Sequence, residues 1–196
     1  MKEFNTLLHQ TISRLFLVVW PPFAEDSALA IDISMGFVFT QDPNCLCIVS
    51  TDTNNLCMPC LKYEMLPDVI LPWPSFYFRM EQWMTGVEEA DLNRENDKFT
   101  AVEAFAKPRV LDTEYYEVTN VYLFVGIVAH TIRSIEFIRM QNTAVPFGVK
   151  LMFDKDYVLS SPINDGNTIE TAYFNKNANI LNFERIGSIT YDAITG

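Results

Sequence analysis

The sequence predicts an α+β protein that is predominantly antiparallel β, with two similar β-meander halves. Short segments rich in β-branched and aromatic residues alternate with turn residues, and one part of the chain resembles another. Because 49% of the 196 residues are apolar, the chain can bury a large core, and no low-complexity linker interrupts it. We therefore expect a single domain over 1–196, with halves at roughly 1–62 and 118–191 joined by an aromatic and acidic middle segment, 63–117.

The resemblance between the halves covers two stretches. Gly36 to Met58 aligns without gaps on Gly148 to Glu170, and the apolar and turn residues agree better than the identities do. Upstream, Thr11-Ile12 corresponds to Thr131-Ile132, and apolar residues follow in both places. This pattern predicts an internal duplication of a three-stranded β-meander of about 40 residues.

The first half begins with a short helix, because Phe4, Leu7 and Leu8 have helical spacing before Gln10. Strands follow, since β-branched and aromatic residues then dominate. The expected strands and turns are Ser13 to Trp20, Ala30 to Thr40, the turn Asp42-Pro43-Asn44, Cys45 to Ser50 and the turn Asp52-Thr53-Asn54-Asn55.

The middle segment contains prolines at 59, 67, 72 and 74, which argue against a long helix because each removes a backbone donor. The residues around Trp73 are therefore expected to form an ordered aromatic loop. Alternation of aromatic residues over Phe76 to Arg79 alternatively predicts a core-facing strand there. The stretch 99–105 fits a helix or a strand, and Pro108 ends either one.

The second half repeats the β character of the first. An apolar run from Val121 to Val128 precedes a set of strands and turn signals. The expected elements are a strand over Thr131 to Met140, a hairpin over Gly148 to Ser160 with its turn at Asp154-Lys155-Asp156, a turn at Asn164-Asp165-Gly166-Asn167, and strands over Ile169 to Phe174 and Ile186 to Tyr191.

The chain is acidic, with a net charge of −11 and a pI near 4.5. Without a basic stripe, nucleic acid and anionic membranes are excluded as expected partners. The acidity concentrates between Glu81 and Glu117, and a field of that sign steers basic partners, although a solvated face explains it too. No apolar run is long enough for a bilayer and the start lacks a secretory pattern, so we expect a cytoplasmic protein.

The four cysteines, Cys45, Cys47, Cys57 and Cys60, lie within 16 residues. This is the kind of clustering that a tetrahedral zinc site needs. Core packing is the simpler interpretation, because Cys45 and Cys47 share a strand face and their counterparts in the second half are apolar or aromatic. The run Cys57-Met58-Pro59-Cys60 resembles the dithiol of thioredoxin-like proteins. That resemblance implies an attacking thiolate at Cys57 and a resolving one at Cys60, although nearby prolines interrupt the helix such a motif needs.

No nucleophile elbow, phosphate-binding glycine loop or zinc-protease motif is present, and the two histidines, His9 and His130, precede equivalent Thr-Ile pairs. We therefore expect a non-enzymatic module without a cofactor that binds a basic protein, of the kind seen in toxin-neutralising immunity proteins. The alternatives are a zinc or dithiol protein built on the four cysteines and a subunit of a homo-oligomer. The expected contact residues are Trp73, Tyr77, Trp83, Glu88, Glu89 and Asp91.

Overall fold

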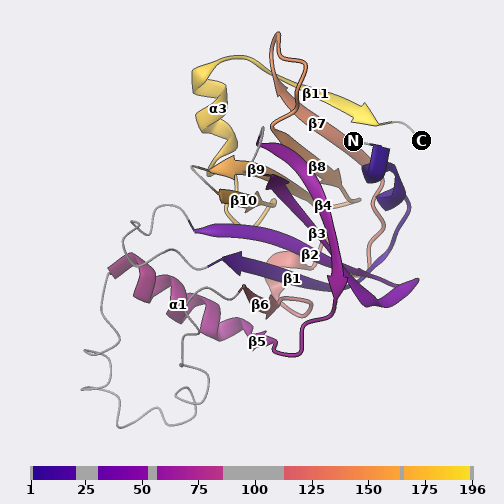
Figure 1. Ribbon diagram of the computed structural model, residues 1–196, viewed down its shortest axis with the longest axis vertical. Coiled ribbons are helices and arrows are strands. Elements are labelled where there is room, and N and C mark those ends of the chain that lie inside the picture. Colours follow the sequence, from indigo (N-terminus) through magenta and orange to yellow (C-terminus); the bar gives the residue numbers. More distant parts are fainter. Residues whose placement is uncertain (1, 21–30, 53–56, 86–112, 164–165, 195–196) are drawn as a thin grey trace.

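A computed structural model of the chain describes residues 2–20, 31–52, 57–85, 113–163 and 166–194. Within them the strands form two sheets, drawn as the lower and upper parts of Figure 1. The first sheet has six strands in the order β4-β3-β2-β1-β6-β5. Its strands are β1 (Ile12–Trp20), β2 (Asp32–Phe39), β3 (Asp42–Asp52), β4 (Met58–Met65), β5 (Leu71–Pro72) and β6 (Glu114–Glu117).

The second sheet has five strands in the order β10-β9-β8-β7-β11. They are β7 (Ser134–Met140), β8 (Gly148–Met152), β9 (Tyr157–Ile163), β10 (Gly166–Glu170) and β11 (Ile189–Ile194). The described helical elements are the 3-10 helices η1 (Lys2–Leu7) and η4 (Tyr122–Phe124) and the α-helices α1 (Trp73–Thr85) and α3 (Ile180–Ile186). The prediction of a β-rich, mainly antiparallel class is therefore confirmed.

The two sheets follow the same order of elements. In each, a 3-10 helix precedes a meander of four antiparallel strands, and a later helix leads into a strand that pairs with the first strand of the meander. The meanders are β1-β2-β3-β4, completed by β6, and β7-β8-β9-β10, completed by β11. Each meander has four strands in place of the three expected.

The halves meet at a contact whose two sides are equivalent. Thr11 and Thr131 form an isolated antiparallel bridge, and their hydroxyl oxygens lie 2.9 Å apart. Backbone bonds flank it in matching pairs: His9 N to Ile132 O (3.0 Å) with Ala129 N to Ile12 O (2.9 Å), and Ile132 N to Gln10 O (3.0 Å) with Ile12 N to His130 O (3.1 Å). The two bonds of each pair are equivalent, because the two donor residues are 120 apart in sequence and so are the two acceptor residues, as Thr11 and Thr131 are. The match of Thr11-Ile12 with Thr131-Ile132 thus coincides with a local twofold arrangement.

The gapless match of Gly36 with Gly148 does not follow the strand register. Gly148 pairs with Ile138 on the first strand of the second meander. The residue equivalent to Ile138 in the first meander is Val18, and Val18 pairs with Ser34, not with Gly36. By the same reasoning Cys47 corresponds to Val158. The match is displaced because the first hairpin turns at Thr40 and Gln41, not at Asp42-Pro43-Asn44, whereas the second turns over 153–156.

One large apolar cluster lies between the sheets. Leu15, Leu17 and Val19 of β1 face it, and both sheets, both 3-10 helices and α1 contribute to it. Its largest fully buried members include Phe4, Phe37, Tyr116 and Phe124. Smaller clusters lie on the outer faces, around Phe16 on the first sheet and Ile138 on the second. The β-strands therefore alternate core-facing and outward-facing residues, as antiparallel strands do.

The prediction of a loop or a strand around Trp73 is wrong, because residues 73–85 form α1. Pro74 lies in the first turn, where backbone amides have no intrahelical partner, so its missing N–H removes no helical bond. Phe76 and Met80 lie one turn apart and pack toward the core, while Tyr77 is exposed. The aromatic residues thus follow a helical period and not strand alternation.

The end of the chain also differs from expectation. The predicted strand over Ile169 to Phe174 ends at Glu170, and the helix α3 was not predicted. The last strand begins at Ile189, three residues later than expected. Among the described helices, none has the length and apolar character needed to cross a bilayer.

Candidate functional site

Two of the predicted contact residues lie at the start of α1 in a cluster of aromatic rings. The Trp73 ring is stacked on Phe76 with centroids 5.1 Å apart and meets Tyr77 edge-on at 4.8 Å. It also meets Phe124 edge-on at 6.2 Å, and Phe124 lies 5.4 Å from Phe174. The Tyr77 ring therefore rests on a packed aromatic base drawn from the middle segment and the second half of the chain.

Tyr77 is the exposed member of this cluster, with 52% of its surface accessible, while Phe76 is buried. Exposed apolar side chains also flank the buried Phe124, at Tyr122 and Val125. Large exposed aromatic side chains next to buried ones are typical of protein-binding surfaces. The structure thus places Trp73 and Tyr77 together, with Tyr77 facing solvent.

The remaining predicted contact residues are not placed. Trp83 belongs to the last part of α1, but its side chain is outside the described residues, as are Glu88, Glu89 and Asp91 entirely.

Arg79 and Glu114 attach α1 to the first sheet. Arg79 Nη2 donates to Glu114 Oε1 at 2.9 Å, and the hydroxyl of Tyr116 donates to the other carboxylate oxygen. Burial and the adjacent Glu114 carboxylate raise the pKa of Tyr116, so it remains a neutral donor. Tyr116 also meets Phe76 edge-on at 5.4 Å. These contacts fix the start of α1 and with it the position of Tyr77.

The four cysteines point to different faces of the first sheet. Cys47 is buried in the main core, and burial raises the pKa of its thiol to about 12. Cys60 pairs with Ser50 across β3 and β4, and Ser50 lies on the outer face, opposite Cys47. None of the four cysteines forms a disulfide within the described part of the chain. Among the described residues, no three His, Cys, Asp or Glu side chains gather closely enough to hold a metal ion.

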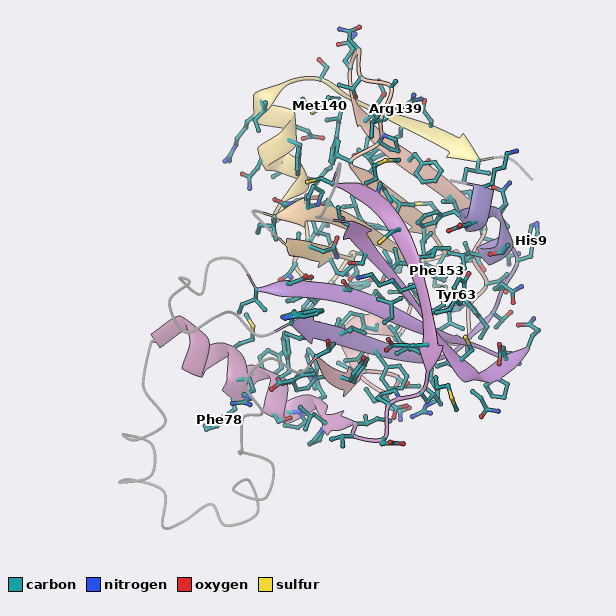
Figure 2. All side chains as sticks on the ribbon, in the orientation of Figure 1. His9, Tyr63, Phe78, Arg139, Met140 and Phe153 are labelled. Atoms are coloured by element: carbon teal, nitrogen blue, oxygen red, sulfur yellow. The ribbon has the colours of Figure 1, made fainter. Side chains whose placement is uncertain are left out.

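The Cys57-Met58-Pro59-Cys60 run lies at the start of β4, where a thioredoxin-like dithiol would need the start of a helix. Cys57 has a positive φ of 50° and precedes the strand, while Cys60 is within it. The two histidines lie on either side of the Thr11–Thr131 bridge: His9 is exposed at the turn between η1 and β1, on the right of Figure 2, and His130 precedes Thr131.

A groove on the outer face of the first sheet contains polar residues that the sequence did not single out. It encloses about 90 Å³ and crosses β1, β2, β3, β4 and β6. Its apolar part is formed by Val18 and Ile48, and Trp20 stands at one end of β1. Its polar lining consists of Asp32, Ser34, Ser50, Lys62, Glu64, Thr113 and Tyr115. This groove is a hollow toward which polar side chains of several strands converge.

The charges that described residues contribute to the groove are two carboxylates and one ammonium group. Burial raises the pKa of Asp32, although the Asn167 backbone N–H and the Lys62 ammonium oppose the shift. Tyr115 donates a hydrogen bond to Glu64, and burial together with that carboxylate raises the pKa of the Tyr115 hydroxyl. Oε1 of Glu64 is buried and has no hydrogen-bond partner within the described part of the chain. A buried acceptor without a donor is costly, so the groove is suited to a donor group.

The sequence contains part of the pattern that identifies this groove. Asp32 and Ser34 alternate with Ile33 and Met35 in a predicted strand, which assigns the two polar residues to one face. The strand order, which places Tyr115 beside Val18, depends on a pairing between distant segments that periodicity does not reveal.

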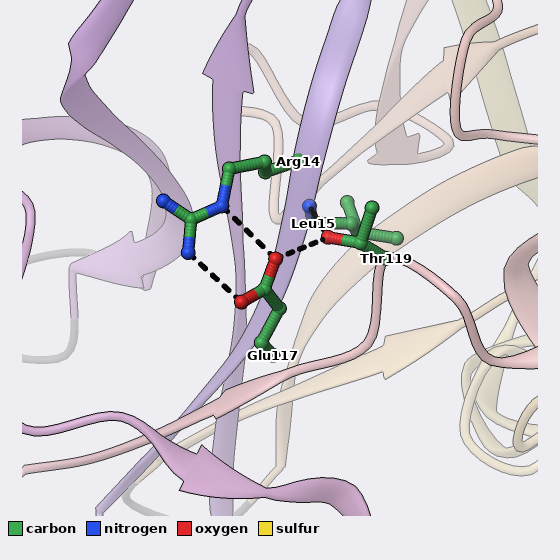
Figure 3. Close-up of polar contacts among 4 residues, drawn as sticks. All are labelled: Arg14, Leu15, Glu117 and Thr119. Carbon is green, nitrogen blue, oxygen red and sulfur yellow. Dashed lines mark hydrogen bonds and ion pairs between the residues drawn. The ribbon is translucent and has the colours of Figure 1, made fainter.

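Other polar clusters are explained by the fold. Arg14 forms a two-pronged ion pair with Glu117 at 2.9 and 2.8 Å, and Thr119 links Glu117 to the backbone of Leu15 (Figure 3). This cluster joins β6 to β1. The fully buried Glu170 accepts backbone N–H groups of Asn179 and Ile180 at the start of α3, at 3.0 and 2.7 Å.

Comparisons with known proteins found no matching family model, no similar curated protein and no similar solved structure.

Proposed function

We propose that this chain is a non-enzymatic module that binds a basic protein, with Tyr77 as the central contact residue. The observation that carries this proposal is the half-exposed ring of Tyr77, held against the packed Trp73 and Phe76 rings. Such a ring offers a large contact area without losing much conformational freedom on binding, because its neighbours already restrict it. Tyrosine and tryptophan are also the residues that most often dominate binding energy at interfaces.

The net charge of −11 supports a basic partner. Acidic residues follow α1 closely in the sequence, at Glu88, Glu89 and Asp91, and we propose that they accelerate association by long-range attraction. A toxin-neutralising immunity protein, which captures a basic enzyme, is the class that fits this combination. Four cysteines that form no disulfide among the described residues suit a reducing compartment, so we propose that the protein acts in the cytoplasm.

Photo-crosslinking from position 77 tests the proposal. Replacing Tyr77 by a photoreactive phenylalanine in the protein's own host should give a covalent complex with one basic protein. Tyr63 is the matched control position, because it is 54% exposed and lies on β4, at the opposite sheet edge from β5 and α1 (Figure 2). Crosslinks from both positions to the same mixture of proteins, or none from position 77, would count against this function.

We also propose that the halves arose by duplication, which the matching order of elements and the paired bonds around Thr11 and Thr131 support. A single-copy relative should form a homodimer through a Thr–Thr bridge of this kind. Single-copy relatives that remain monomers with the same fold would argue against this origin.

A further inference from the structure

The outer faces of the two sheets can be compared position by position. Val18 lies between Ser34 and Tyr115 in the first sheet, as Ile138 lies between Gly148 and Tyr191 in the second. Ile48 is likewise opposite Lys62, as Leu159 is opposite Glu170. The groove described above therefore has a counterpart in the second half, lined by Ile138, Leu159, Glu170 and Tyr191.

In the second half this counterpart is filled by the chain itself. Ile180, in the first turn of α3, packs on Ile138 and Leu159. The Glu170 carboxylate accepts the backbone N–H groups of Asn179 and Ile180. An aliphatic side chain and two backbone donors thus occupy this face together; both donors bind Oε1 of Glu170, and its Oε2 has no hydrogen-bond partner among the described residues.

The first half differs because its equivalent helix lies elsewhere. Like α3, α1 precedes the strand that completes its meander, but Phe76 of α1 packs on Tyr116, on the core side of β6. The neighbouring Tyr115 faces the groove on the other side. Val18 and Ile48 consequently line a hollow, and Glu64 Oε1 has no partner among the described residues.

We propose that this groove receives a short segment of the basic partner that carries an aliphatic side chain next to an arginine or lysine. The inference rests on the proposed function and specifies its contacts. The aliphatic group would lie over Val18 and Ile48, as Ile180 does in the second half, and the cationic group would donate to Glu64 and Asp32. Trp20 adds an aromatic wall suited to a cation.

The size and the charge of the groove both favour a cationic side chain as its occupant. A volume of about 90 Å³ is small beside the roughly 300–1,000 Å³ of pockets that enclose drug-sized ligands, so the groove suits the end of a side chain. Two carboxylates against one ammonium group favour a cation. The chain segments 21–30 and 86–112 both carry a net negative charge by sequence, which makes either of them a poorer match for the carboxylates than a basic partner.

The test uses two capped dipeptides, acetyl-isoleucyl-arginine amide and its citrulline analogue, which has nearly the same shape but no charge. Backbone and indole N–H signals of the full chain are followed by NMR, with the Trp20 indole assigned through a Trp20→Phe variant. The arginine dipeptide should shift the signals of Trp20, Ser34 and Ser50 saturably, and the citrulline form should bind at least about tenfold more weakly. Glu64→Gln should weaken arginine binding by a similar factor, while Glu184→Gln, on α3, should not.

Several outcomes would overturn the proposal: no groove shifts at about 10 mM dipeptide, equal binding of both dipeptides, or shifts centred on α1. Contacts between Ile48 and 21–30 or 86–112, with no dipeptide binding, would assign the groove to the chain's own segment. Because this test does not use the partner, its failure leaves the Tyr77 crosslink intact, and a failed crosslink leaves the dipeptide result intact.

Discussion

Asn167 on β10 forms side-chain hydrogen bonds both to the first sheet and within the second. Its side chain accepts from Thr51 at 2.6 Å and from Ser160 at 2.8 Å, and donates to the Ile33 carbonyl at 2.8 Å. It is fully buried, so no water can replace these bonds without rearrangement. The sequence shows only a turn signal at this position, because the partners come from strands far away in the chain.

Replacing Asn167 by leucine should therefore destabilise the protein by about 3 kcal/mol, since it leaves two hydroxyl groups and a carbonyl unpaired in the core. Urea unfolding measures the change. Asn182→Ala is the matched control, because Asn182 is exposed on α3, and it should change stability by less than about 0.5 kcal/mol. Equal effects of the two substitutions would contradict this role of Asn167.

The Arg14–Glu117 pair makes stability depend on pH in a defined direction. The hydrogen bond from Arg14 lowers the pKa of Glu117. The stabilisation is therefore fully present above the usual glutamate pKa, about 4.3, and is lost as pH falls through the lower value of the folded state. Since both side chains are about one third exposed (34% and 32%), screening limits the pair to about 1 kcal/mol at neutral pH.

Glu117→Gln should thus lower stability at pH 7, and the difference from the unaltered protein should shrink between pH 5 and pH 3. Urea midpoints at several pH values measure it. Glu184→Gln, at an exposed position on α3, serves as the control. A difference that grows toward acid pH would show that Glu117 is not stabilised as its carboxylate.

At the scale of elements, hydrophobic patterning predicted most strands of both meanders but not the helices α1 and α3. The strands alternate clearly because each sheet has a core-facing side. The prediction at α1 was wrong because the prolines argue against a helix there. Pro74 instead lies in the first turn of the helix, and Pro72 lies in the short strand before it. For α3, which has seven residues, the deciding contact is the buried Glu170 carboxylate, a tertiary partner absent from local sequence.

The helical assignment of α1 predicts different results for neighbouring aromatic residues. Phe76→Ala should cost about 3–5 kcal/mol, because Phe76 is buried and packs against Trp73 and Tyr116. Tyr77→Ala should cost less than about 1 kcal/mol, because most contacts of this ring are with solvent. Thermal or urea unfolding measures both, and a larger loss for Tyr77 would place the wrong face of α1 against the core.

At the scale of the whole molecule, the shared apolar cluster makes the two sheets depend on each other. The sequence indicated two related halves but not how they join, because the join consists of backbone bonds around Thr11 and Thr131 and of contacts between strands of different sheets. The candidate site could be predicted in part. Aromatic content indicated Trp73 and Tyr77, whereas the groove can be recognised only once the strand order is known.

Leu151→Ala tests this dependence. Leu151 is buried in the second sheet, and its truncation should cost about 2–5 kcal/mol. Trp20 lies on β1, whereas Trp73 contacts Phe124 of the second half, so the measurement uses a Trp73→Phe, Trp83→Phe background in which Trp20 fluorescence reports on the first sheet. If the sheets unfold together, the fluorescence midpoint should fall as much as the circular dichroism midpoint. An unchanged fluorescence midpoint would mean that the halves unfold independently.

The proposed binding of a basic protein depends on the half-exposed ring of Tyr77. The most direct test is the dissociation constant of the partner captured by the position-77 crosslink, measured for the unaltered protein and for Tyr77→Ala at equal salt concentration. Loss of a central aromatic contact should weaken binding at least about tenfold, while Tyr63→Ala leaves it unchanged. A partner that binds both proteins equally well would contradict the account.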